Sequence, residues 1–213
     1  MGKLKCIIFD CDGVLVDSET IANHVLLTMA REHGLRMSLE EAINVFSGRE
    51  LKDCFRQIEK SISKQLPDDF EKEFRKRTFE AFRNELKPVE GVKEFIDSLN
   101  VAYCVASSGP VEKIRLNLTI TGLIDKFENK IFSSYQINSW KPDPGIFLYA
   151  AREMSFPVSE CIVIEDSKAG VKAGVSGGFR VFGFACENNA KDLENEGATL
   201  FYNYKELPAL LEI

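Results

Sequence analysis

Two aspartates, separated by a single residue, follow a short apolar run near the start of the chain. Residues 4–9 have the composition of a buried strand, and Asp10, Asp12 and Gly13 come directly after it. Ligands of open α/β sheets bind outside the carboxyl ends of the strands. Because a buried carboxylate is costly unless it is paired or bound to a metal ion, the two acids indicate a cation and a reaction at this place.

Polar residues also follow three later strands, which the sequence predicts at 101–106, 130–132 and 161–164. In a parallel sheet the carboxyl ends of all strands lie at one edge, so residues distant in sequence can meet in one crevice. The polar residues that we expect to meet there with the two aspartates are Ser107, Ser108, Lys141, Glu165 and Asp166.

Three of these residues have the chemistry to bind a phosphate. Ser107 offers a hydroxyl, and the backbone amides near Ser108 can surround an anion at the start of the helix predicted from Pro110. Lys141 supplies a positive charge. Together they favour a substrate that carries a phosphoryl group.

The acids fit the transfer of that group. Carboxylates alone repel a phosphate dianion, but Asp10, Asp166 and Glu165 have the oxygen ligands that Mg²⁺ prefers. With the charge neutralised, Asp10 would attack phosphorus and form an aspartyl-phosphate. Asp12 would protonate the leaving alcohol and then deprotonate water.

The composition excludes several classes of function. The 213 residues carry a net charge of −6 at pH 7, which argues against nucleic-acid binding. No apolar run approaches the roughly 18–20 residues that span a bilayer, and no signal-peptide pattern occurs. Six cysteines without a Cys-x-x-Cys pair are typical of buried thiols in a reducing compartment. We expect a cytoplasmic monomer without membrane contact, whose partner is a small phosphorylated metabolite.

The chain is predicted to have two parts. Residues 18–87 have helical periodicity and no convincing strand. Residues 1–17 and 88–213 alternate between apolar strands and helices, which is typical of a doubly wound, mostly parallel sheet. We therefore expect an α/β, Rossmann-like core domain with a helical domain inserted after the first strand.

In this order, the four polar segments resemble the motifs of the haloacid dehalogenase-like hydrolase superfamily. More narrowly, they resemble its β-phosphoglucomutase-like phosphatases, which have a helical cap. Segments 104–110 and 131–144 are also similar to bacterial 6-phosphogluconate phosphatases. The residues that carry the main resemblance are 10–19, 106–108, 141–144 and 165–170.

The resemblance implies a catalytic role for the acids. Asp10 is implied as the nucleophile and as a ligand of Mg²⁺, together with Asp166 and Glu165. Asp12 is implied as the general acid and base, and its backbone carbonyl as a further metal ligand.

The resemblance also implies how the substrate is held. Ser107, the amide of Ser108 and Lys141 would bind the transferring phosphoryl group. The inserted helices would form a cap that closes over the site, and Gly48 and Arg49 would contact the substrate there.

We therefore expect a Mg²⁺-dependent hydrolase of a small phosphorylated sugar or sugar acid, with 6-phosphogluconate as a candidate. One alternative is a β-phosphoglucomutase that works through a bisphosphate intermediate. Those mutases carry a histidine where this chain has Ala22, and basic residues where it has Ser47 and Leu51. A second alternative is a non-catalytic regulator that binds a phosphosugar, against which intact Asp10 and Asp12 argue.

Overall fold

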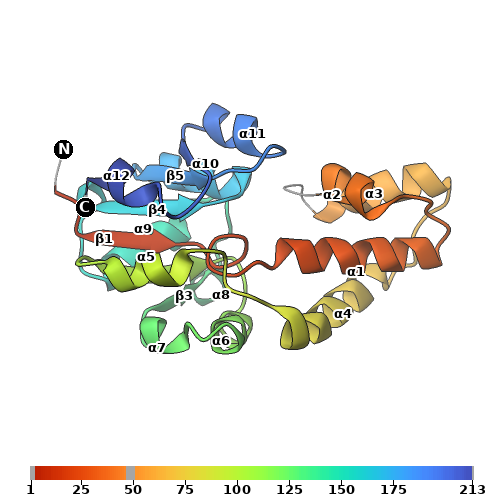
Figure 1. The fold of residues 1–213 in the computed structure, drawn as a ribbon, viewed down its shortest axis with the longest axis horizontal. Coiled ribbons are helices and arrows are strands. Elements are labelled where there is room, and N and C mark those ends of the chain that lie inside the picture. Colours follow the sequence, from red (N-terminus) through yellow and green to blue (C-terminus); the bar gives the residue numbers. More distant parts are fainter. Residues whose placement is uncertain (1–2, 47–50, 213) are drawn as a thin grey trace. The chain divides into compact units, whose positions relative to one another are not determined.

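The computed structural model describes residues 3–46 and 51–212. Within these residues, six strands form one sheet, and every strand is parallel to its neighbours (Figure 1). The strands are β1 (Cys6–Phe9), β2 (Ala102–Ser107), β3 (Ile131–Ser133), β4 (Cys161–Glu165), β5 (Arg180–Phe184) and β6 (Thr199–Phe201). The α/β, doubly wound, Rossmann-like fold that the sequence predicts is confirmed.

The strand order β3-β2-β1-β4-β5-β6 sets where a ligand can bind. The chain passes from β1 outward through β2 and β3, and then continues on the other side of β1 with β4. Phe9 is paired with Val105 on one side and with Ile164 on the other. The order reverses at β1, and in open α/β sheets ligands bind beyond the carboxyl ends of the strands at such a reversal.

The contacts divide the chain into two compact units. The helical unit is Asp17–Leu86, and the sheet unit is Met1–Val16 with Lys87–Ile213. The boundaries predicted from the sequence lie one residue later at both crossings. The helices of the helical unit are α1 (Glu19–Glu32), α2 (Leu39–Phe46), α3 (Leu51–Ile62) and α4 (Phe70–Glu85).

Helices cover both faces of the sheet. Cys6 and Ile8 of β1 pack in a core with α9 and α10, whereas the Phe9 ring meets Phe95 of α5 and Phe127 of α7 on the other face. Such two-sided packing is typical of a buried parallel strand. The helices of this unit are α5 (Val92–Ser98), α6 (Val111–Ile120), α7 (Ile124–Phe127), α8 (Ser134–Ile137), α9 (Gly145–Glu153), η1 (Val158–Glu160), α10 (Lys168–Ser176), α11 (Ala190–Asn195) and α12 (Leu207–Leu211).

The helical unit has an apolar core of its own. Phe70 and Phe74 of α4 are buried, and both meet the ring of Phe55 edge-on. The N-terminus of α2 carries a capping box, in which Ser38 and Glu41 each accept a hydrogen bond from the other's backbone amide. The burial of Phe70 and Phe74 and their contacts with Phe55 show that the spacing of these phenylalanines along the helices reflects packing within the helical unit.

Three short helices, α7, α8 and η1, are absent from the sequence prediction. α7 and α8 span four residues each and η1 spans three, so they are too short for an apolar period to emerge. The strands predicted at 4–9, 101–106, 130–132 and 161–164 are present, and their ends differ from the prediction by at most two residues. Among the described residues, no helix is both long and apolar enough to cross a membrane.

Candidate active site

Asp10 lies where β1 ends, at the reversal of the strand order. Its backbone amide donates to the carbonyl of Ile164 at 2.9 Å, which fixes the residue against β4. The residue is 7% exposed, so its carboxylate is almost fully removed from water. An unpaired charge in such a place would be costly, and a cation is therefore required nearby.

Lys141 supplies that cation. Its Nζ donates to Asp10 Oδ1 at 2.6 Å and to Glu165 Oε1 at 2.5 Å, and its side chain is 6% exposed. Burial raises the pKa of Asp10 to about 7, although the Lys141 cation opposes the shift. Burial would lower the pKa of Lys141, but the two carboxylates raise it above its ordinary value. Lys141 is therefore charged at neutral pH.

Glu165 is fully buried, and both of its oxygens are occupied. Oε1 accepts from Lys141, while Oε2 accepts from the amide of Asp166 at 2.9 Å and from the amide of Ser167 at 2.8 Å. The hydroxyl of Ser167 donates to the same oxygen at 2.9 Å. These bonds place Glu165 as the anchor of Lys141 and of the turn into α10.

Three carboxylates converge at this edge of the sheet. Ligand oxygens of Asp10, Glu165 and Asp166 all lie within 4.8 Å of one another, which suits a hard cation. Gly13 has a φ of +76°, and a Cβ atom there would lie 1.8 Å from Asp166 Oδ2. A glycine at position 13 is therefore needed for Asp166 to reach its place beside the Asp10 loop.

Asn189 fixes the backbone of Asp166 from the loop after β5. Its side-chain amide donates to the carbonyl of Asp166 at 2.9 Å and to that of Phe184 at 3.3 Å. Its Oδ1 accepts from the amide of Cys186 at 2.7 Å. Sequence reasoning missed Asn189, because a lone asparagine in a loop gives no signal of a contact with a residue 23 positions away.

Asp12 occupies a different environment from Asp10. It accepts from Lys113 Nζ at 2.7 Å and from Asn117 Nδ2 at 3.3 Å, and both partners belong to α6. Burial would lower the pKa of Lys113, but Asp12 raises it above its ordinary value. Sequence reasoning also missed these two partners, whose spacing of four residues on the helix after Ser107 was the available signal.

The segment after β2, which carries the predicted phosphate-binding residues, is fixed by hydrogen bonds. Ser107 is 2% exposed, and its Oγ accepts from the amide of Gly109 at 3.1 Å. Ser108 is partly exposed. Ser133, which is paired with Ser107 across the sheet, donates its hydroxyl to the carbonyl of Gly109 at 2.6 Å. The turn is thereby held next to β3 before α6 begins.

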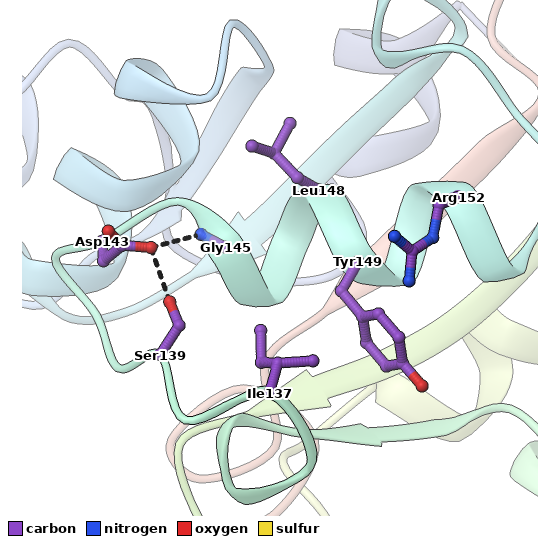
Figure 2. A pocket seen from close by; sticks show the side chains of 7 residues that line it. All are labelled: Ile137, Ser139, Asp143, Gly145, Leu148, Tyr149 and Arg152. Carbon is purple, nitrogen blue, oxygen red and sulfur yellow. Dashed lines mark hydrogen bonds between the residues drawn. The ribbon is translucent and has the colours of Figure 1, made fainter.

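Hydrogen bonds between Ser139, Asp143 and Gly145 stabilise the loop that follows β3 and also contains Lys141 (Figure 2). Asp143 accepts from the Ser139 hydroxyl at 2.5 Å and from the Gly145 amide at 2.8 Å, and these bonds lower its pKa. The peptide between Lys141 and Pro142 is cis. The hollow drawn there lies between α8 and α9 and includes none of the predicted site residues.

The structure thus brings together Asp10, Lys141, Glu165 and Asp166, with Asp12 on the loop that follows Asp10. Gly48 and Arg49, expected to contact the substrate, lie outside the described residues.

Comparison with known proteins identifies the family. The model of the haloacid dehalogenase-like hydrolases matches residues 7–184, which include all the acids of the site. The chain belongs to the haloacid dehalogenase-like hydrolases. A solved haloacid dehalogenase-like protein of unknown function from Agrobacterium tumefaciens has a TM-score of 0.90 to it, with 31% identity and 98% of each chain covered.

Two curated relatives of this hydrolase are phosphatases. The 6-phosphogluconate phosphatase of Escherichia coli K12 is 32% identical over 99% of this chain and 96% of its own length. The phosphorylated carbohydrates phosphatase of Thermotoga maritima is 27% identical over 98% of this chain and 99% of its own length. Family and relatives together make this hydrolase a phosphatase.

Proposed function

We propose that this hydrolase removes the phosphoryl group from a small phosphorylated sugar or sugar acid, in a Mg²⁺-dependent reaction through a phosphorylated Asp10. The first substrate to consider is 6-phosphogluconate. The observation that carries the proposal is the buried Lys141 ammonium between Asp10 and Glu165, with Asp166 beside them, at the reversal of the strand order.

The donor set fits Mg²⁺. Asp10 and Asp166 offer carboxylate oxygens at the crevice, and Asp12 could add its backbone carbonyl. Glu165 belongs to the same cluster, but its oxygens already accept four hydrogen bonds, so we assign it to holding Lys141. When bound, Mg²⁺ would supply the positive charge that lets a carboxylate approach a phosphate dianion.

In the first step, an oxygen of Asp10 forms a bond with phosphorus, and the bond from phosphorus to the sugar oxygen breaks. Asp12 gives its proton to that oxygen, so the sugar leaves as a neutral alcohol. Lys141 keeps the Asp10 carboxylate in one orientation and balances its charge. Ser107 and the Ser108 amide would hold the oxygens of the transferring group.

In the second step, Asp12 takes a proton from water, and the water oxygen attacks phosphorus. The bond between phosphorus and Asp10 breaks, and inorganic phosphate leaves. Asp12 therefore alternates between acid and base, while Asp10 acts as nucleophile and then as leaving group. The two residues have the different surroundings that such a division of roles requires, since one contacts Lys141 and the other contacts Lys113.

The substrate class rests on the relatives. Two phosphatases that match almost the full length of this chain act, by their names, on 6-phosphogluconate and on phosphorylated carbohydrates. Contact of Gly48 and Arg49 with the sugar stays a prediction. So do the monomeric state and the cytoplasmic location.

A panel of phosphorylated metabolites tests the proposal. Release of inorganic phosphate would be measured with Mg²⁺ and with EDTA, for the wild type and for Asp10→Asn. We expect Mg²⁺-dependent release from sugar phosphates and no release by the variant. Asp97→Asn, which removes a carboxylate on α5, is the matched control and should keep wild-type activity.

The same panel separates the alternatives. A β-phosphoglucomutase would convert β-glucose 1-phosphate into glucose 6-phosphate in a coupled assay with little release of phosphate. A non-catalytic regulator would bind sugar phosphates equally well with Asp10→Asn and hydrolyse none. Either result would contradict the proposed hydrolysis.

A further inference from the structure

We propose that Lys113 and Asn117 are positioning residues, which together hold the carboxyl group of Asp12 where, once it has taken a proton from water, it can protonate the leaving alcohol. The inference rests on the proposed function, because it assigns a task to two residues in the first chemical step. It goes beyond that function because neither residue belongs to the acids and phosphate-binding groups already described.

Lys113 and Asn117 bind the two oxygens of Asp12 separately. Lys113 donates to Asp12 Oδ2 at 2.7 Å, and Asn117 donates to Asp12 Oδ1 at 3.3 Å. Each oxygen of the carboxylate thus has its own donor. Because the two donors are four residues apart, they lie on the same face of α6 and approach Asp12 together. A carboxylate held at both oxygens cannot rotate without losing a bond.

The burial of Asn117 and its unpaired Oδ1 support a role for its side-chain amide beyond packing. Asn117 is 1% exposed, and its Oδ1 has no hydrogen-bond partner among the described residues. A buried, unpaired carbonyl oxygen destabilises a fold, and an exception of this kind calls for an explanation. The hydrogen bond from Asn117 Nδ2 to Asp12 explains why an asparagine occupies this buried position.

In this proposal, residues 107–113 serve both the phosphoryl group, through Ser107, and the leaving alcohol, through the contact of Lys113 with Asp12. Ser107 ends β2, Gly109 accepts the Ser133 hydroxyl, and Lys113 follows in the first turn of α6. A Cβ atom at Gly109 would lie 3.5 Å from both Ser107 Oγ and Lys113 Cδ. Ser107 and the aliphatic part of the Lys113 side chain therefore lie on either side of Gly109. In this proposal, that arrangement fixes the position of Asp12 relative to the phosphoryl group.

A positioning role predicts dependence on the leaving group. An alkoxide leaves poorly and needs the proton of Asp12, whereas a nitrophenolate leaves without help. The ratio kcat/KM reports only the steps up to loss of the alcohol, so it is insensitive to the later use of Asp12 as a base. A residue with a merely structural role would lower kcat/KM equally for both kinds of ester.

The experiment compares a sugar phosphate with p-nitrophenyl phosphate for Lys113→Met and Asn117→Leu. We expect kcat/KM to fall about tenfold or more for the sugar phosphate, and less than about threefold for the aryl ester. Lys113→Arg, which keeps the charge, should recover much of the loss. The control is Lys126→Met, since Lys126 is also paired with an aspartate and its side chain is 28% exposed, against 31% for Lys113.

Stability gives a second readout. Asn117→Leu removes the unpaired oxygen, so its melting temperature should hold or rise while the sugar phosphate activity falls. A loss of activity that accompanies unfolding in Lys113→Met but not in Asn117→Leu leaves the second variant as the test. Equal losses for both esters in Asn117→Leu would overturn the proposal.

Asp12→Asn separates this inference from the proposed function. If Asp12→Asn discriminates between the two esters and the α6 variants do not, the positioning role is wrong and the acid role stands. If Asp12→Asn loses both activities equally, the acid role itself fails. A rise in sugar phosphate activity in Lys113→Met would show that the contact with Lys113 keeps Asp12 from acting on the leaving group. This result would also overturn the proposal.

Discussion

The carboxylate of Glu165 packs directly against Gly170 in the first turn of α10. A Cβ atom at position 170 would lie 1.8 Å from Glu165 Oε1. The missing side chain leaves room for a fully buried carboxylate that accepts from Lys141 and from the start of the helix. Glycine in a helix interior is unfavourable by itself. Here it is retained because the anchor of the site occupies the space.

Gly170→Ala should therefore damage both stability and turnover. The added methyl group displaces Glu165, and Lys141 moves with it, so we expect a loss of at least about 1–3 kcal/mol in the free energy of unfolding. Denaturant unfolding and kcat/KM would measure the two effects. Lys172→Ala, at an exposed position of the same helix, is the control and should change neither. Wild-type stability in Gly170→Ala would contradict the described packing.

Lys141→Met removes the cation between two buried carboxylates. Breaking a buried ion pair from one side leaves uncompensated charge, and costs about 3–5 kcal/mol. Turnover should fall by about 10²-fold or more, because Asp10 loses its orienting partner and the phosphoryl group loses a positive charge. Lys168→Met affects two long ion pairs, with Asp192 and with the partly buried Glu196, and should be close to wild type in both assays. A stable and active Lys141→Met would rule out this role.

Asp10→Asn should stabilise the protein in a pH-dependent way when no divalent cation is present. Burial raises the pKa of Asp10 to about 7, above the value of about 4 in an unfolded chain. Between these values the folded protein keeps a proton that the unfolded chain has lost, so the contribution of Asp10 to stability falls as the pH rises. The melting temperature of Asp10→Asn should thus exceed that of the wild type by more at about pH 8 than at about pH 5.

The pH-dependent result has a direct control. Asp97→Asn removes a carboxylate that is largely exposed, and its melting temperature relative to the wild type should not follow the same trend. An advantage of Asp10→Asn that is equal at both pH values, or larger in acid, would contradict the effect assigned to burial.

Asn189→Ala should weaken metal binding more than it slows the metal-saturated enzyme. The side chain fixes the carbonyl of Asp166, and loss of such an outer partner typically costs about 10–100-fold in metal affinity. The measurement is the Mg²⁺ concentration that gives half-maximal activity, together with kcat at saturation. Asn203→Ala, which removes an asparagine bonded to Glu206 in another loop, is the control. An unchanged Mg²⁺ requirement would show that Asn189 does not position the metal ligand.

The sequence allowed the fold to be predicted, and also the meeting of Asp10, Glu165 and Asp166 at one edge of the sheet, because both follow from local patterns. Apolar strands that end at Asp10, Ser107 and Glu165 set the edge of the sheet, and the alternation with helices predicted parallel strands. Spatial convergence then followed from the topology, without any knowledge of distances.

The partners of those acids could not be predicted, since they depend on tertiary contacts. Lys113 and Asn117 reach Asp12 across more than 100 positions of sequence. Their spacing of four residues indicates a shared helix face, but it does not indicate which residue that face contacts. The division of work between Asp166 and Glu165 was equally hidden, because both are acids at one strand end. Only the hydrogen bonds show that Glu165 has its oxygens occupied.

The central claim is that Asp10 accepts the phosphoryl group, and rapid acid quenching tests it most directly. Asp12→Asn would be mixed with p-nitrophenyl phosphate and Mg²⁺, quenched, digested and analysed by mass spectrometry. Because the variant lacks the group that activates water, the account predicts one PO₃ unit on Asp10, removed by hydroxylamine. A phosphoryl group on another residue, or release of nitrophenol by Asp12→Asn with no PO₃ unit on Asp10, would contradict it.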